Sequence, residues 1–339
     1  MKVTILGAGP AGSTAAYYLA KGGISVELID RVEFPRDKPC AGGLFNPLLF
    51  DNEFPHTKNF PGKDLFKAHF SCGNYSFNFE SKVPLMRTSL RSDFDQFLLN
   101  KAVEAGADFS IQKNPSPAGK CIIDATGAKK IQDYPRAGIC LVNDFPVTEE
   151  IDTVYIHYGY QGIKGYFWLY PKHGYANIGV GAYLPQKGIR SLYNSFIDLL
   201  EKKAIVSIDK RSCNTKIIPF STAKSLYSES VLKIGDAAGF VRPGTGEGIF
   251  FAMLSGKIAA RSIIENKDFA WYEDQCIHEF GIYLKSAAVG FPTTLLNKIM
   301  QKVVKVGSKD EEFKKRFSEN FFRLEHCRLG ASLVKNIFK

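Results

Sequence analysis

The chain of 339 residues lacks the features that mark several large classes of protein. Its seven cysteines are scattered and form no Cys-x-x-Cys pair, which argues against an iron–sulfur cluster or zinc knuckle and favours free thiols. Its six histidines show no metal-ligand spacing, so we expect no metal. Neither zinc-finger spacing, an aromatic RNP motif nor a helix-turn-helix pattern points to nucleic acid. No apolar run approaches the roughly 18 residues of a membrane span.

Basic residues outnumber acidic ones, and the excess is concentrated near the end of the chain. The formal net charge is +10, and residues 281–339 contain twelve Lys and Arg against five Asp and Glu. Such a segment can meet nucleic acid, an anionic membrane or an anionic substrate. Without a nucleic-acid motif, we favour the last two. A strand directly after Met1 leaves no room for a signal peptide, so we expect a cytoplasmic protein that could lie peripherally on the inner face of the membrane.

The chain opens with the pattern of a strand, a glycine turn and a helix. Gly7 permits a tight turn after the strand at 3–6, Gly9 lets the backbone approach a phosphate, and Gly12 lets the helix pack closely on the sheet. Asp30 ends the next strand, where a carboxylate can accept hydrogen bonds from ribose hydroxyls. The pattern predicts dinucleotide binding. The expected binding residues here are Gly7, Gly9, Pro10, Ala11, Gly12, Asp30 and Arg31.

A second glycine-rich stretch lies at residues 235–249. Asp236, at a strand end, is placed to bind ribityl hydroxyls, and the loop 244–248 begins a helix whose N–H groups and dipole would face the N1/C2 edge of a flavin. One large dinucleotide, FAD, could use both glycine motifs. Small residues after the strand at 121–124 complete the expected contacts with FAD. The expected binding residues of the two segments are Ala125 and Gly127 after that strand, and Gly235, Asp236, Pro243, Gly246, Glu247, Gly248 and Ile249 in the second glycine-rich stretch.

Three further segments carry a resemblance to a known family. Residues 35–44 (PRDKPCAGGL) are similar to the PxxKxCxGG segment of geranylgeranyl reductases, flavoproteins built like aromatic hydroxylases. Residues 91–98 (RSDFDQFL) resemble the family's RxxFDxxL helix start. Residues 166–171 (YFWLYP), with the later Asn-Ile-Gly at 177–179, resemble its YxWxFP…NxG hairpin, although Tyr170 replaces the usual Phe. The resemblance covers roughly residues 1–285.

The resemblance implies a fold and its division into domains. The predicted fold class is α/β, with a Rossmann-like FAD-binding domain of the glutathione-reductase type, an inserted antiparallel β-sheet substrate domain and a C-terminal helical segment. Alternating apolar residues at 69–79 and 131–214 support the sheet, and the pattern from 271 onward is helical. The expected domains are 1–50, 86–130 and 215–275 for FAD, 51–85 and 131–214 for substrate, and 276–339 for the helical segment.

The resemblance also implies the reaction. Reduced flavin would deliver hydride to isolated carbon–carbon double bonds of an isoprenoid chain on a lipid, diphosphate or quinone. Cys40 would be catalytic, beside the flavin and the reacting alkene, with Ala41 and Arg91 on FAD. No second dinucleotide turn follows a strand, so the electron donor would be external, either NAD(P)H or a ferredoxin-like carrier. The implied substrate-binding residues are Gly42, Gly43, Tyr166, Trp168, Tyr170 and Pro171.

Alternatives stay open at this point. Cys40 could simply pack as a small buried hydrophobe, and Tyr166 and Trp168, which share one face of a strand, could line either a core or a pocket. The apolar and basic pattern around 295–305 suits a helix at a membrane interface or one packed on the domain. Because residues 165–171 also resemble the halogenase GWxWxIP pattern, an FAD-dependent monooxygenase or halogenase is the second hypothesis. A non-catalytic prenyl-binding escort is the third.

Overall fold

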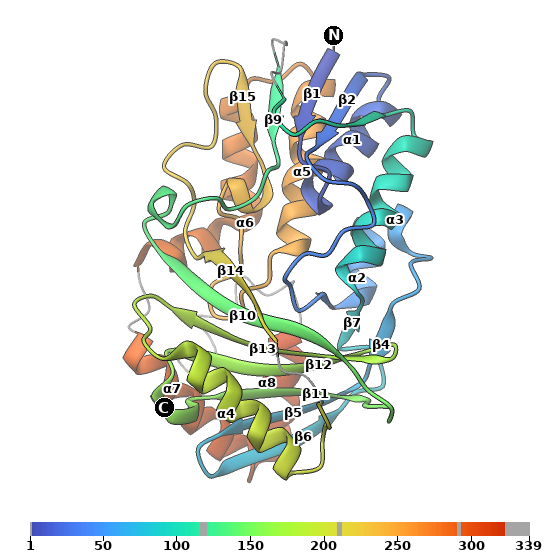
Figure 1. The fold of residues 1–339 in the computed structure, drawn as a ribbon. Coiled ribbons are helices and arrows are strands. Elements are labelled where there is room, and N and C mark those ends of the chain that lie inside the picture. Colours follow the sequence, from blue (N-terminus) through green and yellow to red (C-terminus); the bar gives the residue numbers. More distant parts are fainter. Residues whose placement is uncertain (1, 116–120, 209–211, 290–292, 323–339) are drawn as a thin grey trace. The chain divides into compact units, whose positions relative to one another are not determined.

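The computed structural model describes residues 2–115, 121–208, 212–289 and 293–322, and side chains outside 281–296 (Figure 1). The chain divides into two compact units, each assembled from three separate stretches. Unit 1 comprises residues 1–38, 91–137 and 217–289, and unit 2 comprises residues 39–90, 138–216 and 290–339.

Unit 1 is built on a five-stranded sheet with the strand order β15-β9-β1-β2-β8, in which the paired strands are parallel. Val3 and Ile5 of the central strand are fully buried, as expected where helices cover a parallel sheet. The predicted strand before the glycine turn and the predicted strand that ends at Asp30 are confirmed. The edge strand β8 was not predicted, because it is only four residues long. The strands are β1 Lys2–Leu6, β2 Ser25–Asp30, β8 Asp108–Ile111, β9 Ile122–Asp124 and β15 Val231–Lys233.

Helix α1 is the centre of the helical layer of unit 1 and packs against α3 and α5. Gly256 of α5 permits the close approach, since a Cβ atom there would lie 2.4 Å from the Ala11 carbonyl oxygen. Helix α6 packs on α5 in turn, with the rings of Phe251 and Phe280 5.4 Å apart. The helices are α1 Pro10–Lys21, α3 Arg91–Glu104, α5 Ile249–Ile264 and α6 Phe269–Val289, with short 3₁₀ turns η2 Ile131–Asp133 and η4 Gly235–Ala237.

Unit 2 contains the predicted, mainly antiparallel sheet, with seven strands in the order β14-β10-β13-β12-β11-β5-β6. The pair β11–β5 is parallel, and the neighbouring pairs β11–β12 and β5–β6 are antiparallel. A small sheet, β3-β7-β4, accompanies it. The strands are β3 Gly43–Phe45, β4 Lys63–Leu65, β5 Lys67–Cys72, β6 Tyr75–Glu80, β7 Met86–Thr88, β10 Ala137–Pro146, β11 Thr153–Tyr158, β12 Gly165–Lys172, β13 Tyr175–Tyr183 and β14 Asn214–Pro219.

One face of the large sheet is covered by a helix that the sequence analysis missed, α4 (Ile189–Lys202). Tyr193, Phe196, Ile197 and Leu200 recur at helical spacing and are buried against the apolar side chains of β10, β12 and β13. This periodicity was the available signal. Unit 2 also contains α2 Pro47–Glu53 and the 3₁₀ turns η1 Pro55–Thr57 and η3 Tyr160–Gly162.

Helices α7 (Thr293–Gly307) and α8 (Glu311–Phe322) pack on the strands β5 and β6. Val303 and Val304 are buried, and a Cβ atom at Gly307 would lie 2.6 Å from the ring of Phe77. The packed-helix interpretation is therefore confirmed for this part of α7, whereas the side chains of Leu295 and Leu296 lie outside the described ones. Among the described residues, no helix has the length and apolar character needed to cross a membrane.

The compact units differ from the predicted domains at several boundaries. Residues 39–50 group with unit 2, because β3 pairs with β7 there. The predicted helical segment 276–339 is divided, since residues up to 289 belong with unit 1 and α7 and α8 pack in unit 2. The assignment of FAD to one domain and substrate to the other stays a prediction.

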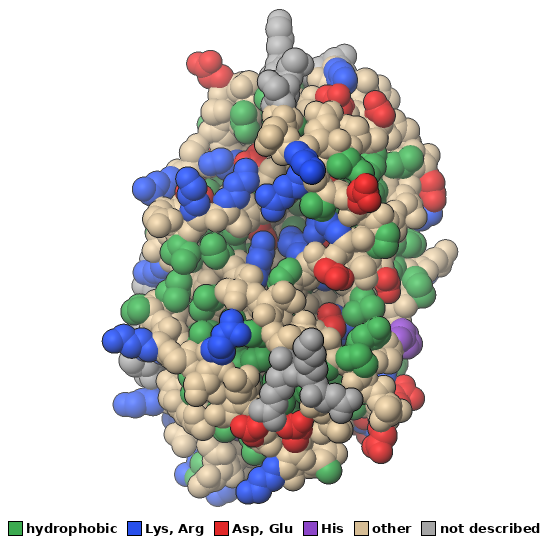
Figure 2. All heavy atoms as spheres, viewed as in Figure 1, with side chains coloured by type: hydrophobic (Ala, Val, Ile, Leu, Met, Phe, Trp, Pro, Cys, Tyr) green, Lys and Arg blue, Asp and Glu red, His purple; other side chains and the backbone are tan. Residues whose placement is uncertain are grey.

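Charged side chains are distributed widely over the surface. Lys and Arg lie over much of the face drawn in Figure 2, with hydrophobic and acidic side chains between them. The whole chain carries a formal net charge of +10.

The packing of α4 generates a stability prediction. Phe196→Ala should lower the free energy of unfolding by about 3 to 5 kcal/mol, because the ring of Phe196 is buried and its centre lies 4.7 Å from that of the Phe167 ring. Chemical unfolding of the purified protein measures this change. Asn194→Ala, at an exposed position of the same helix, is the control and should cost under about 1 kcal/mol. Equal effects of the two substitutions would contradict the assigned role of α4.

Candidate flavin and substrate sites

The glycine turn after β1 is tightly constrained. Gly7 has a φ of +101°, and a Cβ atom there would lie 2.5 Å from the Ala125 carbonyl oxygen. A Cβ atom at Gly12 would lie 1.8 Å from the Gly7 carbonyl oxygen. No side chain other than hydrogen fits at either position, so the turn brings β1, β9 and the start of α1 into direct backbone contact.

The start of α1 has the properties of an anion site. Gly9 is the N-cap and Pro10 occupies the first turn, and none of the described side chains caps the helix or places an acid there. Backbone N–H groups and the helix dipole at such an end favour a phosphate. Asp30, at the end of β2, accepts hydrogen bonds from the N–H groups of Ala8 (2.8 Å) and Arg31 (2.7 Å). A carboxylate has about four acceptor sites, so it retains capacity for ribose hydroxyls.

Arg36 adds positive charge over this turn, and the sequence analysis assigned it no role. A Cβ atom at Gly9 would lie 3.2 Å from the Arg36 guanidinium, which places that group beside the turn. Arg36 pairs with buried Asp95 at 3.1 Å, and Arg91 binds the same carboxylate through two nitrogens at 2.8 and 2.7 Å. Two guanidinium groups thus share one carboxylate, which leaves net positive charge. Contact of Arg91 with FAD stays a prediction.

The second glycine motif lies against the first one within unit 1. A Cβ atom at Gly235 would lie 2.9 Å from the Cβ atom of Ala11, so η4 rests on the start of α1. Asp236 follows in η4, and its carbonyl oxygen accepts a hydrogen bond from the Tyr134 hydroxyl at 2.7 Å. A Cβ atom at Gly248 would lie 3.3 Å from the Asp236 carboxylate. The structure therefore brings together two motifs that are more than 200 residues apart in the sequence.

Glu247 is a buried acid in the loop before α5. Neither carboxyl oxygen has a hydrogen-bond partner among the described residues, and Arg242 is 4.0 Å away. Burial raises the pKa of Glu247 from 4.5 to about 8, against the opposing effect of Arg242. At neutral pH the group is therefore largely a neutral acid, which the sequence alone did not indicate.

The remaining predicted flavin contacts occupy turns of unit 1. Gly127 and Gly246 have positive φ values of 80° and 71°, and Ile249 is buried at the start of α5. Ala125 donates its N–H to the Leu6 carbonyl at 2.8 Å, and Pro243 is half-buried in the loop. Their contacts with FAD stay predictions.

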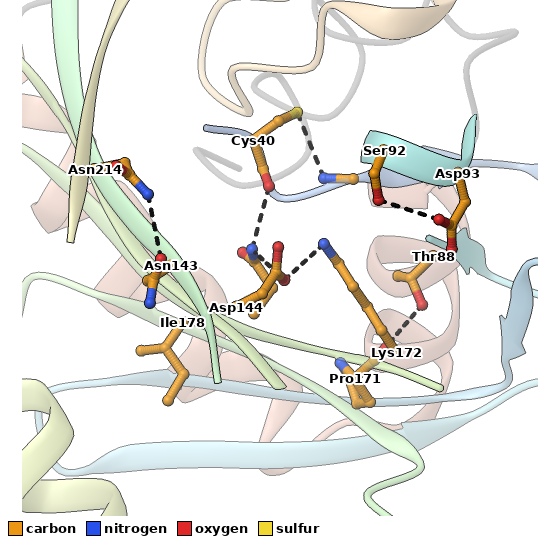
Figure 3. Close-up of polar contacts among 12 residues, drawn as sticks. Cys40, Thr88, Ser92, Asp93, Asn143, Asp144, Pro171, Lys172, Ile178 and Asn214 are labelled. Carbon is orange, nitrogen blue, oxygen red and sulfur yellow. Dashed lines mark hydrogen bonds and ion pairs between the residues drawn. The ribbon is translucent and has the colours of Figure 1, made fainter. Parts of the chain in front are cut away.

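In unit 2, the three predicted aromatic residues form a continuous row along β12. The ring of Trp168 lies 5.6 Å from that of Tyr166 and 6.1 Å from that of Tyr170, and all three are buried. Gly179 on β13 makes room, because a Cβ atom there would lie 2.1 Å from the Trp168 indole. Pro171, the next predicted residue, accepts a hydrogen bond from the Thr88 hydroxyl through its carbonyl oxygen (Figure 3).

The segment Cys40–Gly43 lies against this row. A Cβ atom at Gly43 would lie 3.3 Å from the ring of Tyr170. Gly42 has a φ of +68°, and its carbonyl oxygen accepts the Ser89 N–H at 3.1 Å. The Gly42 N–H points at the Cys40 sulfur at 3.4 Å (Figure 3). The structure thus brings together the predicted substrate residues Gly42, Gly43, Tyr166, Trp168, Tyr170 and Pro171 with Cys40, and with Ala41, whose predicted contact is with FAD.

Three polar residues beneath this segment were not predicted as site residues. Asn177 on β13 donates to the Cys40 carbonyl oxygen at 3.1 Å and to Asp144 on β10 at 2.8 Å. Lys172 on β12 forms an ion pair with Asp144 at 2.7 Å (Figure 3). A charged residue at the end of a strongly apolar strand was the available signal for Lys172. No sequence pattern connects Asp144 to it, because the pairing depends on strand register.

Among the described residues, no cluster of His, Cys, Asp and Glu side chains could hold a metal ion.

Comparisons with known proteins agree with this architecture. A family model described as an NAD(P)-binding Rossmann-like domain matches residues 5–35. An uncharacterized protein of Methanosarcina barkeri is 32% identical over 289 residues, which cover 77% of this chain and 74% of that protein. A digeranylgeranylglycerophospholipid reductase of Methanosphaera stadtmanae is 28% identical, with 85% and 81% of the two chains covered.

Solved structures share the fold. A geranylgeranyl bacteriochlorophyll reductase-like protein of Thermoplasma acidophilum superimposes with a TM-score of 0.76 at 21% identity, over 99% of this chain and 98% of that one. A flavin-dependent brominase superimposes with a TM-score of 0.69 at 18% identity, over the same shares of the two chains. These similarities confirm the predicted fold class.

The fold and the paired glycine motifs define an FAD-dependent oxidoreductase. Among such enzymes, the chain belongs to the geranylgeranyl reductase family.

The position of Arg36 predicts its effect on the cofactor. Arg36→Ala should weaken FAD binding about tenfold or more, because a charge-assisted contact to an anion contributes about 1.5 to 3 kcal/mol. The flavin-to-protein ratio after dialysis measures this effect, and Arg36→Lys should give an intermediate value. Arg190→Ala, at an exposed position, is the control. Full flavin occupancy in Arg36→Ala would refute the assignment.

The neutral state of Glu247 predicts a pH dependence of stability. Its folded pKa of about 8 lies above the ordinary 4.5, so the folded state binds more protons than the unfolded state between these values. The free energy of unfolding should therefore fall as pH rises from about 5 to 8, relative to Glu247→Gln. Unfolding of both apoproteins across this range measures the difference. Parallel pH profiles would show that Glu247 ionises normally.

Proposed function

We propose that this protein saturates carbon–carbon double bonds of an isoprenoid chain carried on a lipid, a diphosphate or a quinone. The observation that carries the proposal is the attachment of the Cys40–Gly43 segment to the aromatic row of β12 inside unit 2. The names of curated relatives, among them a geranylgeranyl diphosphate reductase of Rhodobacter capsulatus, support the same substrate class.

The residues of unit 1 fit FAD. The glycine turn at Gly7, Gly9 and Gly12 would admit a pyrophosphate beside Arg36. At Gly7 and Gly12 there is no room for a Cβ atom. Asp30 would bind the ribose, and Asp236 would bind the ribityl chain. The buried carboxyl of Glu247, which has no hydrogen-bond partner among the described residues, would face the flavin ring together with the first turn of α5. When bound and reduced, FAD supplies the hydride, and a proton would be added to the other carbon of the double bond.

The residues of unit 2 would bind and orient the substrate. Tyr166, Trp168 and Tyr170 would contact the isoprenoid chain through ring faces, which suit an apolar chain that offers no hydrogen-bonding group. An isolated alkene has no carbonyl through which the protein could stabilise developing charge, so position relative to the hydride donor matters most. Cys40 would contact the chain at the reacting carbon atoms.

The partners follow from this chemistry. A reductant outside the chain, NAD(P)H or a ferredoxin-like carrier, would reduce the flavin. A lipid-borne substrate would be met at a membrane surface, and exposed Lys298 and Lys305 on α7 support peripheral contact through charge, because the apolar face of that helix is largely buried. Such contact should weaken with salt.

The alternatives have less support. The hypothesis of a non-catalytic prenyl-binding escort has no support, because the chain belongs to a family of oxidoreductases. A halogenase or monooxygenase shares the fold, as the brominase shows, but a likeness at 18% identity reaches no further than the fold. It would need dioxygen, and a halogenase also halide, whereas the proposed reduction needs neither.

The proposal is tested by incubating the dithionite-reduced protein, without oxygen, with geranylgeranyl diphosphate and with geranylgeranylated lipids. Mass spectrometry should show the gain of two hydrogen atoms for each double bond reduced. A substrate that gains mass only in the presence of dioxygen and halide would favour the second hypothesis.

Cys40 should affect this reaction without affecting cofactor content. Cys40→Ala should keep its FAD and lower turnover or change the number of double bonds reduced, because the thiol would sit at the reacting chain. Cys213→Ala, another half-buried thiol of unit 2, is the control. Equal turnover and equal products in Cys40→Ala would show that the thiol only packs.

A further inference from the structure

We propose that Asn177 is the positioning residue for Cys40, and that Asp144 and Lys172 hold Asn177 in the orientation that this role requires. The proposal rests on the proposed function for its consequence in catalysis. Its structural part, the control of the Cys40 thiol by Asn177, can be tested without any substrate.

Strand register places the three residues on one face of the sheet. Asn177 on β13 lies opposite Asp144 on β10 and opposite Tyr170 on β12. Lys172 is two residues beyond Tyr170, so its side chain leaves β12 on the same face. Asn177 and Lys172 are almost fully buried, with exposed fractions of 0% and 3%.

The Asn177 amide has one allowed orientation. Its nitrogen donates to the Cys40 carbonyl oxygen at 3.1 Å and to the Asp144 carboxylate at 2.8 Å. Its oxygen accepts the indole N–H of Trp168 at 2.8 Å. If the amide were reversed, its oxygen would face two acceptors and its nitrogen would face a donor. All of its polar contacts would then become repulsive, which is costly in a buried site.

Asp144 and Lys172 stabilise this orientation. The Lys172 ammonium lies 2.7 Å from the same Asp144 oxygen that accepts from Asn177 (Figure 3). The ion pair keeps the Asp144 carboxylate aimed at the amide nitrogen, so the second Asn177 hydrogen is directed to the Cys40 carbonyl. The lysine thus acts on Cys40 through two intervening side chains.

Cys40 is thereby fixed at both ends of a short segment. Asn177 holds the Cys40 carbonyl, and two residues later the Gly42 carbonyl accepts the Ser89 N–H at 3.1 Å. Between these points, the Gly42 N–H points at the Cys40 sulfur at 3.4 Å. Loss of the Asn177 contact would free the end of the segment that carries the thiol, while the Ser89 contact would remain.

The experiment compares two identical substitutions on opposite faces of one sheet. Asn177→Asp preserves the side-chain shape and the acceptor for Trp168, and it removes both donors. Asn143→Asp is the matched control, since Asn143 on β10 lies on the other face. It donates a hydrogen bond to Ser212 and accepts one from Asn214 of β14, and Figure 3 shows the contact with Asn214.

The readout is the alkylation rate of Cys40 by iodoacetamide in the FAD-loaded full chain, resolved from the other cysteines by peptide mass spectrometry. Asn177→Asp should raise the rate about fivefold or more, as expected for the loss of about one hydrogen bond. Asn143→Asp should leave it unchanged. Lys172→Met removes the ion pair with Asp144 and leaves the Asn177 side chain in place. It should raise the alkylation rate of Cys40 less than Asn177→Asp does, and it provides the test if Asn177→Asp fails to fold.

A folded Asn177→Asp or Lys172→Met protein with the wild-type Cys40 rate would overturn the proposal, as would equal increases in Asn143→Asp. The catalytic part has its own readout, a larger share of partly reduced isoprenoid products in Asn177→Asp than in the wild type. If the alkylation result holds and no isoprenoid is reduced by the wild type, the proposed function fails and the positioning role stands.

Discussion

The hydrogen-bonded register of β10, β13 and β12 is the constraint on which the substrate unit depends. Asp144, Asn177 and Tyr170 lie opposite one another across these strands, and Trp168 lies opposite Gly179. Because side chains alternate between faces, a shift by one residue would turn this set onto the face that α4 covers. The apolar residues beneath α4 therefore fix the position of the polar residues on the other face.

The two units differ in the chemical groups that they would present to a ligand. Unit 1 offers backbone N–H groups, glycines that admit close approach, and guanidinium charge at Arg36, which together suit a charged dinucleotide. Unit 2 offers ring faces and the buried polar cluster of Asn177, Asp144 and Lys172, which suit an apolar chain. In unit 2 the polar atoms of Asn177 are all directed inward to protein partners, so the cluster positions a segment of the chain and leaves the aromatic row apolar.

The sequence predicted most of what depends on local pattern. The glycine motifs, the strands around them, the aromatic row and the C-terminal helices were recognisable because their spacing is set by helix and strand geometry. The strand β8 was too short to recognise, and the helical period of α4 was overlooked within an alternating region. Arg36 and Asp144 could not be assigned, because their roles depend on partners far away in the sequence. Glu247 was a predicted FAD contact, but its neutral state could not be predicted, because it depends on burial.

The order of strands in unit 1 has a consequence for how the protein is made. The N-terminal strand β1 is flanked by β2, which follows within thirty residues, and by β9, whose other neighbour β15 ends at Lys233. On the ribosome, one edge of β1 must therefore wait for more than a hundred residues to be synthesised before its partner exists. Closing so long a loop is slow and exposes an apolar edge meanwhile. The five-stranded sheet can be completed only after the third stretch of unit 1, which carries β15, has been synthesised.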